Sequence, residues 1–358
     1  MLAIEEILRE SELLRTTNEL DLFQTSIFNE LTQLHLQQCP PYKKIVQSFF
    51  GKYESAASLE QIPYLPIGLF KVIDLISVPG SSVVRTLNSS GTSGKTSKVF
   101  LDKITAINQI KVLVEIFNQT IGAEKMPMVI IDMKESANSE DAINARLAAV
   151  KGFSVFASEK YYALDENLKI QIDLLEELAD KYGNSKVMFF GFTFLVWENL
   201  VKKLESQGIV FQFPNAILVH GGGWKKLSNQ SISAEIFKQR VKNVLGIDKV
   251  FNYYGMAEQT GSIYFECSES NFHTTLFGQI IIRNFNDFSP NKIGEIGIVQ
   301  LLSVVPRSYP GHSILTEDVG VIVGDNGCEC GNSGRFFKIL GRLPEAEIRG
   351  CSDVYGNE

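Results

Sequence analysis

The sequence predicts an α/β protein with mostly parallel sheets flanked by helices, followed by a smaller β-rich section. Two observations predict this fold class. Amphipathic helical segments alternate with short apolar runs between Thr105 and Tyr254, which is typical of parallel strands joined by crossover helices. Beyond Gly261 the helical patterns stop, and only strand-like segments remain. No internal repeat, low-complexity tract or long linker interrupts the 358 residues, so any domains should pack closely.

The part of the chain before residue 81 is expected to be mainly helical. Apolar side chains in residues 4–38 recur at spacings near three and four, the run Cys39-Pro-Pro ends that pattern, and residues 42–53 are predicted to form a second helix. Residues 62–71 are strongly apolar, but their prolines prevent a regular helix. This segment is expected to pack on the core, with a role as one wall of a substrate pocket as the alternative.

The remaining elements are predicted from periodicity and from their Gly, Pro and Asn boundaries. The predicted helices of the alternating part are residues 105–122, 142–150, 165–181, 194–207 and 234–245. Its predicted strands are residues 128–132, 153–156, 187–191, 216–220 and 250–254. The strands of the β-rich section are predicted at residues 262–265, 275–283, 297–302 and 319–323.

Composition limits the classes of function. A hydrophobic content of 44% and a charged content of 21% are ordinary for a globular protein. The net charge of −7 and the pI near 5.4 argue against nonspecific nucleic-acid binding. No apolar run approaches the roughly 18 residues of a membrane span, and the acidic start lacks the features of a signal peptide. Five scattered cysteines fit reduced thiols. The sequence therefore predicts a cytoplasmic protein with no membrane span.

The stretch 87–98 carries the strongest local signal for a ligand. It combines two glycines, several hydroxyl side chains and two lysines between two apolar runs, a composition that can wrap backbone N–H groups around phosphate oxygens. It is not a Walker A loop, because Ser89 stands where that motif needs glycine and because the loop leads into a strand-like run. A strand–loop–strand phosphate cradle is predicted, and a plain Gly/Ser-rich hairpin turn is the alternative.

Two further loops follow predicted strands, where ligands bind in open α/β sheets. In residues 219–225, three glycines before a Trp-Lys pair allow a flat ring or a phosphate to approach the backbone. In residues 253–258, tyrosines offer an aromatic face and Glu258 offers a carboxylate for Mg²⁺. Each loop taken alone is also compatible with an ordinary turn.

Taken together, these segments resemble the core motifs of adenylate-forming enzymes, and most closely the acyl-protein synthetases of the LuxE type. The motifs that carry the resemblance occur in the expected order, at residues 87–98, 253–258, 315–320 and 340–342. Residues 62–71, 221–225 and 341–352 add the likeness to the acyl-protein synthetases. The resemblance implies the large N-terminal domain of an adenylate-forming enzyme with its C-terminal domain absent or truncated. The implied divisions are a helical region at 1–80, the core at 81–340, and a hinge and tail at 341–358.

The resemblance implies ATP and Mg²⁺ as cofactors and assigns residues to their phosphate end. The loop that would hold the β- and γ-phosphates consists of Ser89, Ser90, Gly91, Thr92, Ser93, Gly94 and Lys95. Lys95 would also neutralise charge during catalysis, and Glu258 would hold Mg²⁺. The stretch after Arg342 contains no lysine to match the catalytic one of larger relatives. Either Lys95 and Mg²⁺ suffice, or a partner supplies that cation, or the chain has been cut short.

The resemblance also assigns residues to the nucleoside end of ATP. Gly222 and Gly223 would line the adenine site, and Tyr254 would stack on the base. Asp318 would bind the ribose hydroxyls, and Arg342 would sit at the hinge near the ribose or a phosphate. From the residues alone, a Thr-Glu-Asp segment such as the one that ends at Asp318 is more often a turn at a strand end.

The implied reaction is activation of a carboxylic acid, fatty-acyl in preference, to an acyl-adenylate, followed by transfer to Cys351. Arg349 two residues away would favour the reactive thiolate. The acyl group would then pass to a protein partner such as an acyl reductase. An acyl- or aryl-CoA ligase and a noncatalytic nucleotide-binding accessory subunit are the alternatives, and a purely structural role is the alternative for the cysteine itself.

Two other groups of residues leave alternatives open. Cys328 and Cys330 invite a zinc interpretation, which is the less favoured one because only Cys267 or Cys351 remain as distant further ligands. The histidines show no pattern for a nucleophilic triad, and His312 is expected to be a hydrogen-bonded loop residue rather than an active-site group. The apolar stretches 62–70 and 189–197 could line an acyl pocket, although core packing explains them as well.

Overall fold

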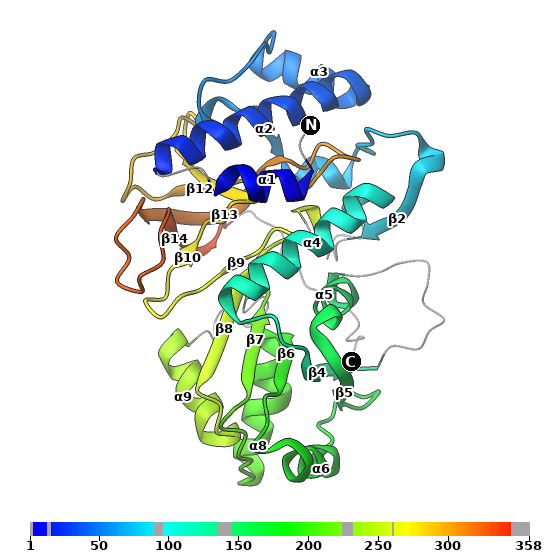
Figure 1. The fold of residues 1–358 in the computed structure, drawn as a ribbon, viewed down its shortest axis with the longest axis vertical. Helices are drawn as coiled ribbons and strands as arrows, with labels where there is room; N and C mark the ends of the chain where they lie inside the picture. The colour runs from blue at the N-terminus through cyan, green and yellow to red at the C-terminus, as the bar shows by residue number, and fades with distance from the viewer. Residues whose placement is uncertain are drawn as a thin grey trace. The chain divides into compact units, whose positions relative to one another are not determined.

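A computed structural model describes residues 3–12, 16–88, 96–134, 145–223, 232–259 and 261–344. The described residues form two compact units. Unit 1 contains the described residues up to Ile116 and from Gly255 onward, and unit 2 contains those from Phe117 to Tyr254. The two units are described separately below (Figure 1).

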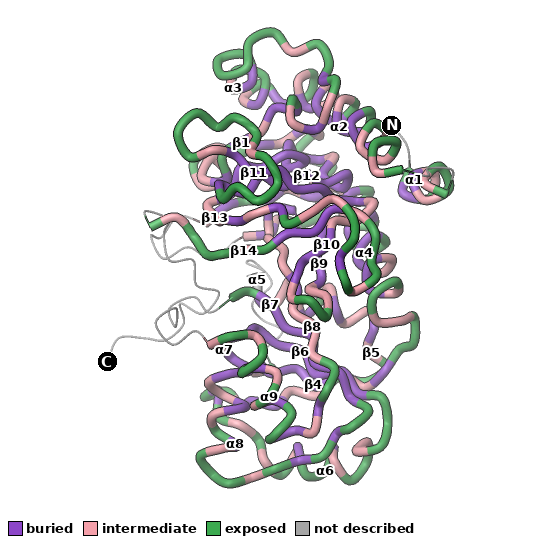
Figure 2. The backbone as a smooth tube through the Cα atoms, turned by 90° about the vertical axis from the view of Figure 1, so that its left-hand side faces the viewer, coloured by how far each residue is buried: buried purple, intermediate pink, exposed green. Residues whose placement is uncertain are grey.

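Unit 2 is built on a parallel sheet, as predicted. Its strands are β4 (Met126–Met133), β5 (Ala157–Leu164), β6 (Met188–Phe192), β7 (Ile217–Gly221) and β8 (Lys249–Tyr254). They lie in the order β5-β4-β6-β7-β8, and all neighbours run parallel. Helices that cover both faces of a parallel sheet bury its strands, which explains the nearly continuous apolar runs in the sequence. In β6 and β7 every residue is buried, and Figure 2 shows β4, β6 and β7 mostly in the buried colour.

The helices of unit 2 are α5 (Ala145–Phe153), α6 (Ile172–Tyr182), α7 (Thr193–Leu195), a π-helical segment (Val196–Val201), α8 (Lys202–Gln207) and α9 (Ala234–Leu245). Two sequence predictions were wrong here. Residues 153–156 are not a strand but the end of α5 and a 3-10 turn (Ser154–Phe156). The helix predicted at 165–181 begins only at Ile172, because the Asp165 carboxylate accepts the backbone N–H groups of Asn167 and Lys169 in a tight turn.

Unit 1 contains the predicted β-rich section, whose main strands form an antiparallel sheet. Its strands β10 (Phe272–His273), β14 (Phe336–Arg342), β13 (Ser313–Gly324), β12 (Gly297–Ser303) and β11 (Gly278–Arg283) lie side by side in that order. The short strand β9 (Tyr264–Phe265) precedes them in the chain. The strand predicted at residues 275–283 begins later than expected, at Gly278, and the strand predicted at residues 319–323 begins earlier, at Ser313. The apolar segment 62–71 forms β1 (Leu65–Pro66), parallel to β13, between 3-10 turns at Leu59–Gln61 and Ile67–Lys71, and it packs in the core as expected.

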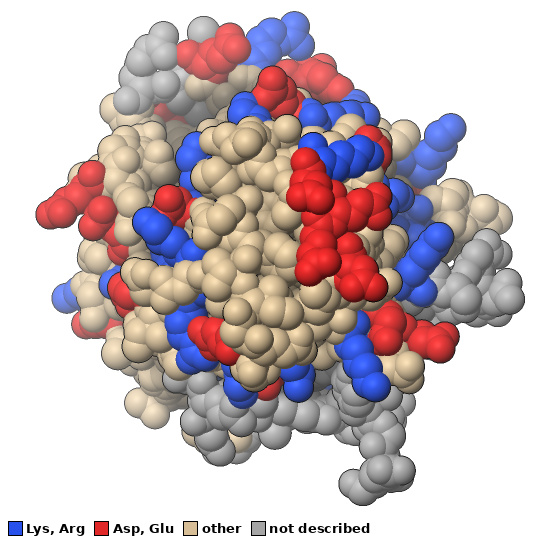
Figure 3. All heavy atoms as spheres, turned by 90° about the horizontal axis from the view of Figure 1, so that it is seen from below, with Lys and Arg blue, Asp and Glu red and all other residues tan. Residues whose placement is uncertain are grey.

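The N-terminal helical pattern consists of two helices rather than one. They are α1 (Ile4–Ser11) and α2 (Thr17–Gln38), followed by α3 (Pro40–Phe50). The second start is fixed by a capping box, in which Thr16 Oγ1 accepts the Glu19 N–H and Glu19 accepts the Thr16 N–H. A 3-10 turn (Gly80–Ser82), the hairpin β2 (Val83–Asn88) and β3 (Lys98–Asp102), and helix α4 (Lys103–Thr120) follow. On the face seen in Figure 3, the basic side chains are scattered, and several acidic side chains lie together in one group.

The side chains of His35, His220 and His312 are buried and neutral. In unit 1, His312 Nε2 lies 2.9 Å from Thr32 Oγ1, and its ring stacks on that of His35 at 5.0 Å between centroids. In unit 2, His220 Nδ1 lies 2.9 Å from Thr193 Oγ1. Burial lowers the pKa of His35 and His220 to about 3 and that of His312 well below its ordinary value. The expectation that His312 is a hydrogen-bonded structural residue is therefore confirmed.

These pKa values predict that stability falls in mild acid. Below pH 6.5 the unfolded chain binds a proton at each histidine while the folded chain does not, so stability is complete above pH 6.5 and is lost as the pH falls toward 3. Each histidine should contribute a slope of up to about 1.4 kcal/mol per pH unit. Urea unfolding at pH 7, 6 and 5 measures this dependence. His220→Gln should reduce the dependence of the unfolding free energy on pH by about the contribution of one histidine. An unchanged dependence would contradict the burial of His220 as a neutral side chain.

Candidate nucleotide site

The predicted phosphate loop is framed by an antiparallel hairpin. Strand β2 pairs with β3, and Leu87 faces Val99 while Asn88 faces Lys98 at the loop end. This confirms the strand–loop–strand arrangement that distinguished the loop from a Walker A motif. The seven residues assigned to phosphate binding, Ser89 to Lys95, lie outside the described residues, as does Cys351. The hairpin therefore fixes where the loop begins and ends in unit 1.

Glu258 lies on a short 3-10 turn (Ala257–Gln259) that packs against β3, the strand that leaves the phosphate loop. Side-chain hydrogen bonds hold this turn. The Tyr309 hydroxyl donates to the Glu258 carbonyl oxygen at 2.8 Å, and Gln259 Nε2 donates to the Gly311 carbonyl oxygen at 2.8 Å. The Glu258 residue is only 2% exposed. The carboxylate oxygens of Glu258 are hard donors of the kind that Mg²⁺ prefers.

Asp318 and Arg342 are brought together by the pairing of β13 with β14. Their Cα atoms are register partners, and Arg342 Nε lies 3.2 Å from Asp318 Oδ1. Arg342 Nη2 also donates to Glu317 Oε2 at 2.6 Å. Thr316 Oγ1 accepts a hydrogen bond from the Asp318 backbone N–H at 3.0 Å, which orients the backbone at Asp318. Arg342 is thus partly exposed and is held by two carboxylates. Glu317, which provides one of them, was not among the site residues predicted from the sequence.

In unit 2, the glycines and the tyrosine assigned to adenine lie at the carboxyl ends of neighbouring strands. Gly221 at the end of β7 is the register partner of Tyr253 in β8. Gly222 and Gly223 come directly after β7, and Tyr254 is the last residue of β8. Tyr253 is buried against Phe153, with ring centroids 5.2 Å apart, whereas Tyr254 is only half-buried. The alternation of the strand thus leaves Tyr254 as the more accessible ring.

Gly222 is a position where any side chain is expected to be destabilising. Its φ is +82°, and a Cβ there would lie 2.5 Å from Phe192 Cδ1. The neighbouring Gly223 has a similar φ of +62°, but a Cβ there would meet nothing within 4 Å. Gly223→Ala should therefore show only the backbone cost of about 1 kcal/mol, and Gly222→Ala about 1–3 kcal/mol more because Phe192 must move. Urea unfolding of the two variants measures the difference. Equal losses would contradict the close approach to Phe192.

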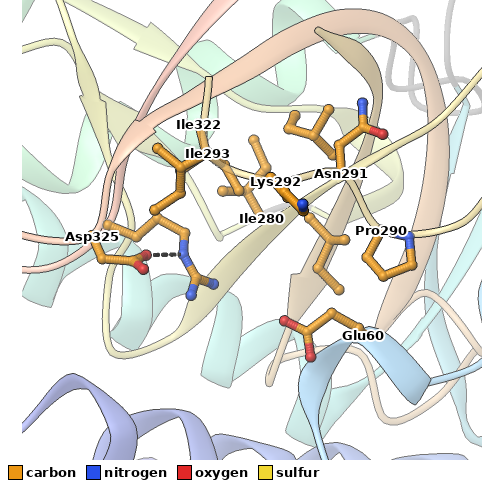
Figure 4. A pocket seen from close by; sticks show the side chains of 11 residues that line it. Glu60, Ile280, Pro290, Asn291, Lys292, Ile293, Ile322 and Asp325 are labelled. Carbon is orange, nitrogen blue, oxygen red and sulfur yellow. Dashed lines mark hydrogen bonds and ion pairs between the residues drawn. The ribbon is translucent and has the colours of Figure 1, made fainter. Parts of the chain in front are cut away.

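The structure also contains a cavity that the sequence did not predict. Its volume is about 400 Å³, and it lies on the antiparallel sheet of unit 1 (Figure 4). Its lining combines apolar side chains from β11 and β13 with an ion pair of 2.7 Å between Arg335 Nε and Asp325 Oδ1. The residues that line it are Glu60, Ile280, Ile281, Ile282, Pro290, Asn291, Lys292, Ile293, Ile322, Asp325 and Arg335. No residue assigned to ATP belongs to this set.

The apolar stretch 189–197 is buried as core in unit 2.

The fold resembles that of a CoA ligase of known structure. An open conformation of 2-hydroxyisobutyryl-CoA ligase with 2-HIB-AMP and CoA superposes with a TM-score of 0.65 at 14% identity, covering 90% of this chain and 74% of that one. The same ligase in its thioesterification state gives a TM-score of 0.67 at 14% identity, covering 92% and 69%. The architecture is thus that of the adenylate-forming ligases, as predicted.

The chain belongs to the LuxE acyl-protein synthetase family, which matches residues 4–358. A long-chain-fatty-acid–luciferin-component ligase of Vibrio harveyi is 22% identical over 336 residues, 89% of this chain and 84% of that protein. The ligase of the same name from Aliivibrio fischeri is 23% identical over 274 residues, covering 74% and 70%. The protein is therefore an ATP-dependent ligase that activates a carboxylic acid. Among the described residues, no helix is long and apolar enough to cross a membrane.

Proposed function

We propose that the enzyme adenylates a long-chain fatty acid and then carries the acyl group as a thioester on Cys351 before passing it to a protein acceptor such as an acyl reductase. The named relatives act on long-chain fatty acids, which supports the choice of substrate. Membership of the acyl-protein synthetase family supports transfer to protein. The cytoplasmic location predicted from the sequence stays a prediction.

The packing of β3 on the turn that holds Glu258 is the observation that supports the proposed binding of ATP. Strand β3 begins three residues after Lys95, so the strand that follows the predicted phosphate loop lies against the turn with the buried carboxylate. Phosphate oxygens and a carboxylate within one assembly are the ligands that Mg²⁺ uses in nucleotide sites. In this proposal Glu258 holds the ion, and the ion when bound neutralises charge on the phosphates of ATP.

The remaining contacts to ATP are assigned residue by residue. Asp318 accepts hydrogen bonds from the ribose hydroxyls, and its ion pair with Arg342 orients the carboxylate. Arg342 lies near the ribose or a phosphate. In unit 2, Gly222 and Gly223 line the adenine, and the accessible ring of Tyr254 stacks on the base. Together with Lys95, these assignments rest on the family motifs and await the experiments below.

The chemistry has two balanced steps. A carboxylate oxygen of the acid attacks the α-phosphorus of ATP, a new P–O bond forms, and the bond to the β-phosphate breaks with release of pyrophosphate. The Cys351 thiolate then attacks the acyl carbonyl carbon, the thioester C–S bond forms, and AMP leaves with the electron pair of the broken C–O bond. The protein contributes chiefly positioning and stabilisation of charge, with Lys95 and the backbone amides of the loop facing the phosphates.

The two alternatives differ in what accepts the acyl group. A CoA ligase would release acyl-CoA and leave no stable acyl-enzyme, and the structural similarity to 2-hydroxyisobutyryl-CoA ligase gives that alternative its support. A noncatalytic nucleotide-binding subunit would form neither product. Family membership as a ligase argues against the noncatalytic alternative.

Incubation with ATP, Mg²⁺ and radiolabelled carboxylic acids of graded chain length tests the proposal. The expected result is label on the protein that hydroxylamine removes, greatest for long-chain fatty acids and independent of CoA. Label that appears only in acyl-CoA when CoA is added would establish the CoA ligase instead. Absence of AMP with every acid, with or without CoA, would support the accessory role.

A further inference from the structure

Three cysteines and a histidine converge at one end of the antiparallel sheet in unit 1. Their ligand atoms, the sulfurs of Cys267, Cys328 and Cys330 and a ring nitrogen of His273, all lie within 4.8 Å of one another. Cys267 follows β9, His273 ends β10, and the other two cysteines lie in the connection between β13 and β14. His273 and Cys328 are buried, and the remaining two side chains are half-buried. The cluster is thus assembled from two separate turns.

The spacing of these atoms matches the edges of a zinc tetrahedron. With Zn–S bonds near 2.3 Å and Zn–N bonds near 2.0–2.1 Å, ligand sulfurs lie about 3.8 Å apart and a sulfur and a nitrogen about 3.6 Å apart. Here the sulfurs of Cys267 and Cys328 are 3.8 Å apart, and Cys330 Sγ lies 3.3 Å from His273 Nε2. The sulfurs are too far apart for a disulfide, which needs about 2.05 Å, and the cysteines are free thiols.

The backbone around the cluster is shaped to present the sulfurs. Gly327 and Gly331 flank the Cys328-Glu-Cys330 segment with φ values of +84° and +85°, and the Gly331 N–H bonds back to the Cys328 carbonyl oxygen at 3.0 Å. These left-handed glycines allow a tight turn that other residues rarely adopt. As a result, both sulfurs of the turn face the same ligand atoms of the β9–β10 region.

Hydrogen-bond donors point at two of the sulfurs. The Asn332 backbone N–H lies 3.4 Å from Cys330 Sγ, and Asn271 Nδ2 lies 3.6 Å from Cys328 Sγ. Donors directed at sulfur stabilise a thiolate, the form that binds zinc, and such outer contacts are regular companions of metal ligands. The His273 ring is held in place by stacking on Phe336, its register partner in β14, with 5.7 Å between centroids. The ligands are therefore oriented before any metal binds.

We propose that Cys267, His273, Cys328 and Cys330 bind one structural Zn²⁺. Four protein ligands fill a tetrahedral site and leave no open position for substrate, so the ion has a structural rather than a catalytic role. It ties the β9–β10 region to the connection between β13 and β14. The opposite end of the same β13–β14 pair carries Asp318 and Arg342, so the ion also braces the hairpin that presents these residues. The zinc site does not depend on the proposed acyl transfer.

Metal analysis of the full chain tests this site. Protein saturated with Zn²⁺ and then freed of unbound metal should hold about one zinc per chain. Cys328→Ser and His273→Ala should each hold less than about a fifth of that amount, because the loss of one of four ligands opens the site. Cys39→Ala is the matched control, since Cys39 is buried at the junction of α2 and α3, and it should keep the full zinc content.

Two measurements on the unaltered protein keep the test decisive if a variant fails to fold. Replacement of zinc by Co²⁺ should give the intense visible bands and the thiolate charge-transfer band of a tetrahedral sulfur site. Removal of the metal with a chelator should lower the melting temperature by roughly 5 °C or more, and added zinc should restore it. Wild-type protein without stoichiometric zinc, an octahedral cobalt spectrum, or full zinc content in folded Cys328→Ser would each overturn the proposal.

Discussion

Cys351→Ala should abolish the hydroxylamine-labile acyl label on the protein while leaving acid-dependent exchange between ATP and pyrophosphate near the wild-type rate. The reason is that the thiolate enters only the second step, after the acyl-adenylate has formed. The measurement pairs the label on denatured protein with the exchange rate of the same preparation. Because the alanine variant should still form acyl-AMP, the adenylate should accumulate in the enzyme-bound fraction.

The matched control is Cys39→Ala, which removes a thiol from the core. Cys39 is fully buried, and burial raises the pKa of its thiol, so it is a poor nucleophile. This variant should keep both the acyl label and the exchange activity. Full labelling of Cys351→Ala, or equal loss of label in both variants, would show that another residue carries the acyl group.

Glu258→Gln should lower acid-dependent exchange by about 100-fold or more, the scale expected when one preorganised electrostatic contact to the transition state is lost. Glutamine has nearly the same shape as glutamate but no charge, so it preserves the packing of the turn against β3 and removes the carboxylate for Mg²⁺. The loss should be partly relieved by raised Mg²⁺, and the exchange rate measured against Mg²⁺ concentration checks this.

Glu295→Gln provides the control for that charge change. Glu295 is an exposed carboxylate in a loop of the same unit, and its neutralisation should leave exchange unchanged. The melting temperature of Glu258→Gln should remain close to that of the wild type, which separates loss of metal binding from unfolding. Wild-type exchange in folded Glu258→Gln would remove this residue from the site.

The parts of the fold that follow from continuous apolar runs were predictable from the sequence. Strands such as β6 and β7 are buried on every residue, and this signal does not depend on distant contacts. One error occurred where local hydrogen bonds override the periodicity of the sequence. The Asp165 carboxylate accepts backbone N–H groups in a turn. The helix that the apolar pattern predicts from residue 165 therefore begins only at Ile172.

The candidate site was predictable as a set of motifs but not as a set of contacts. The contact of Asp318 with Arg342 depends on the register between β13 and β14, which shifts at Val319/Gly320, and no spacing in the sequence specifies such a shift. His273 was missed as a metal ligand for the same reason. It comes close to Cys330 because β10 pairs with β14, a contact between segments that are distant in sequence.

Acid-dependent exchange of radiolabelled pyrophosphate into ATP is the most direct test of the central claim that the enzyme activates a fatty acid through an acyl-adenylate. Exchange requires reversible adenylation and no acyl acceptor, so it is independent of Cys351 and of CoA. We predict exchange that needs both Mg²⁺ and the acid and that is fastest with long-chain fatty acids. Exchange without any acid, or no exchange with any acid of the graded series, would contradict the account.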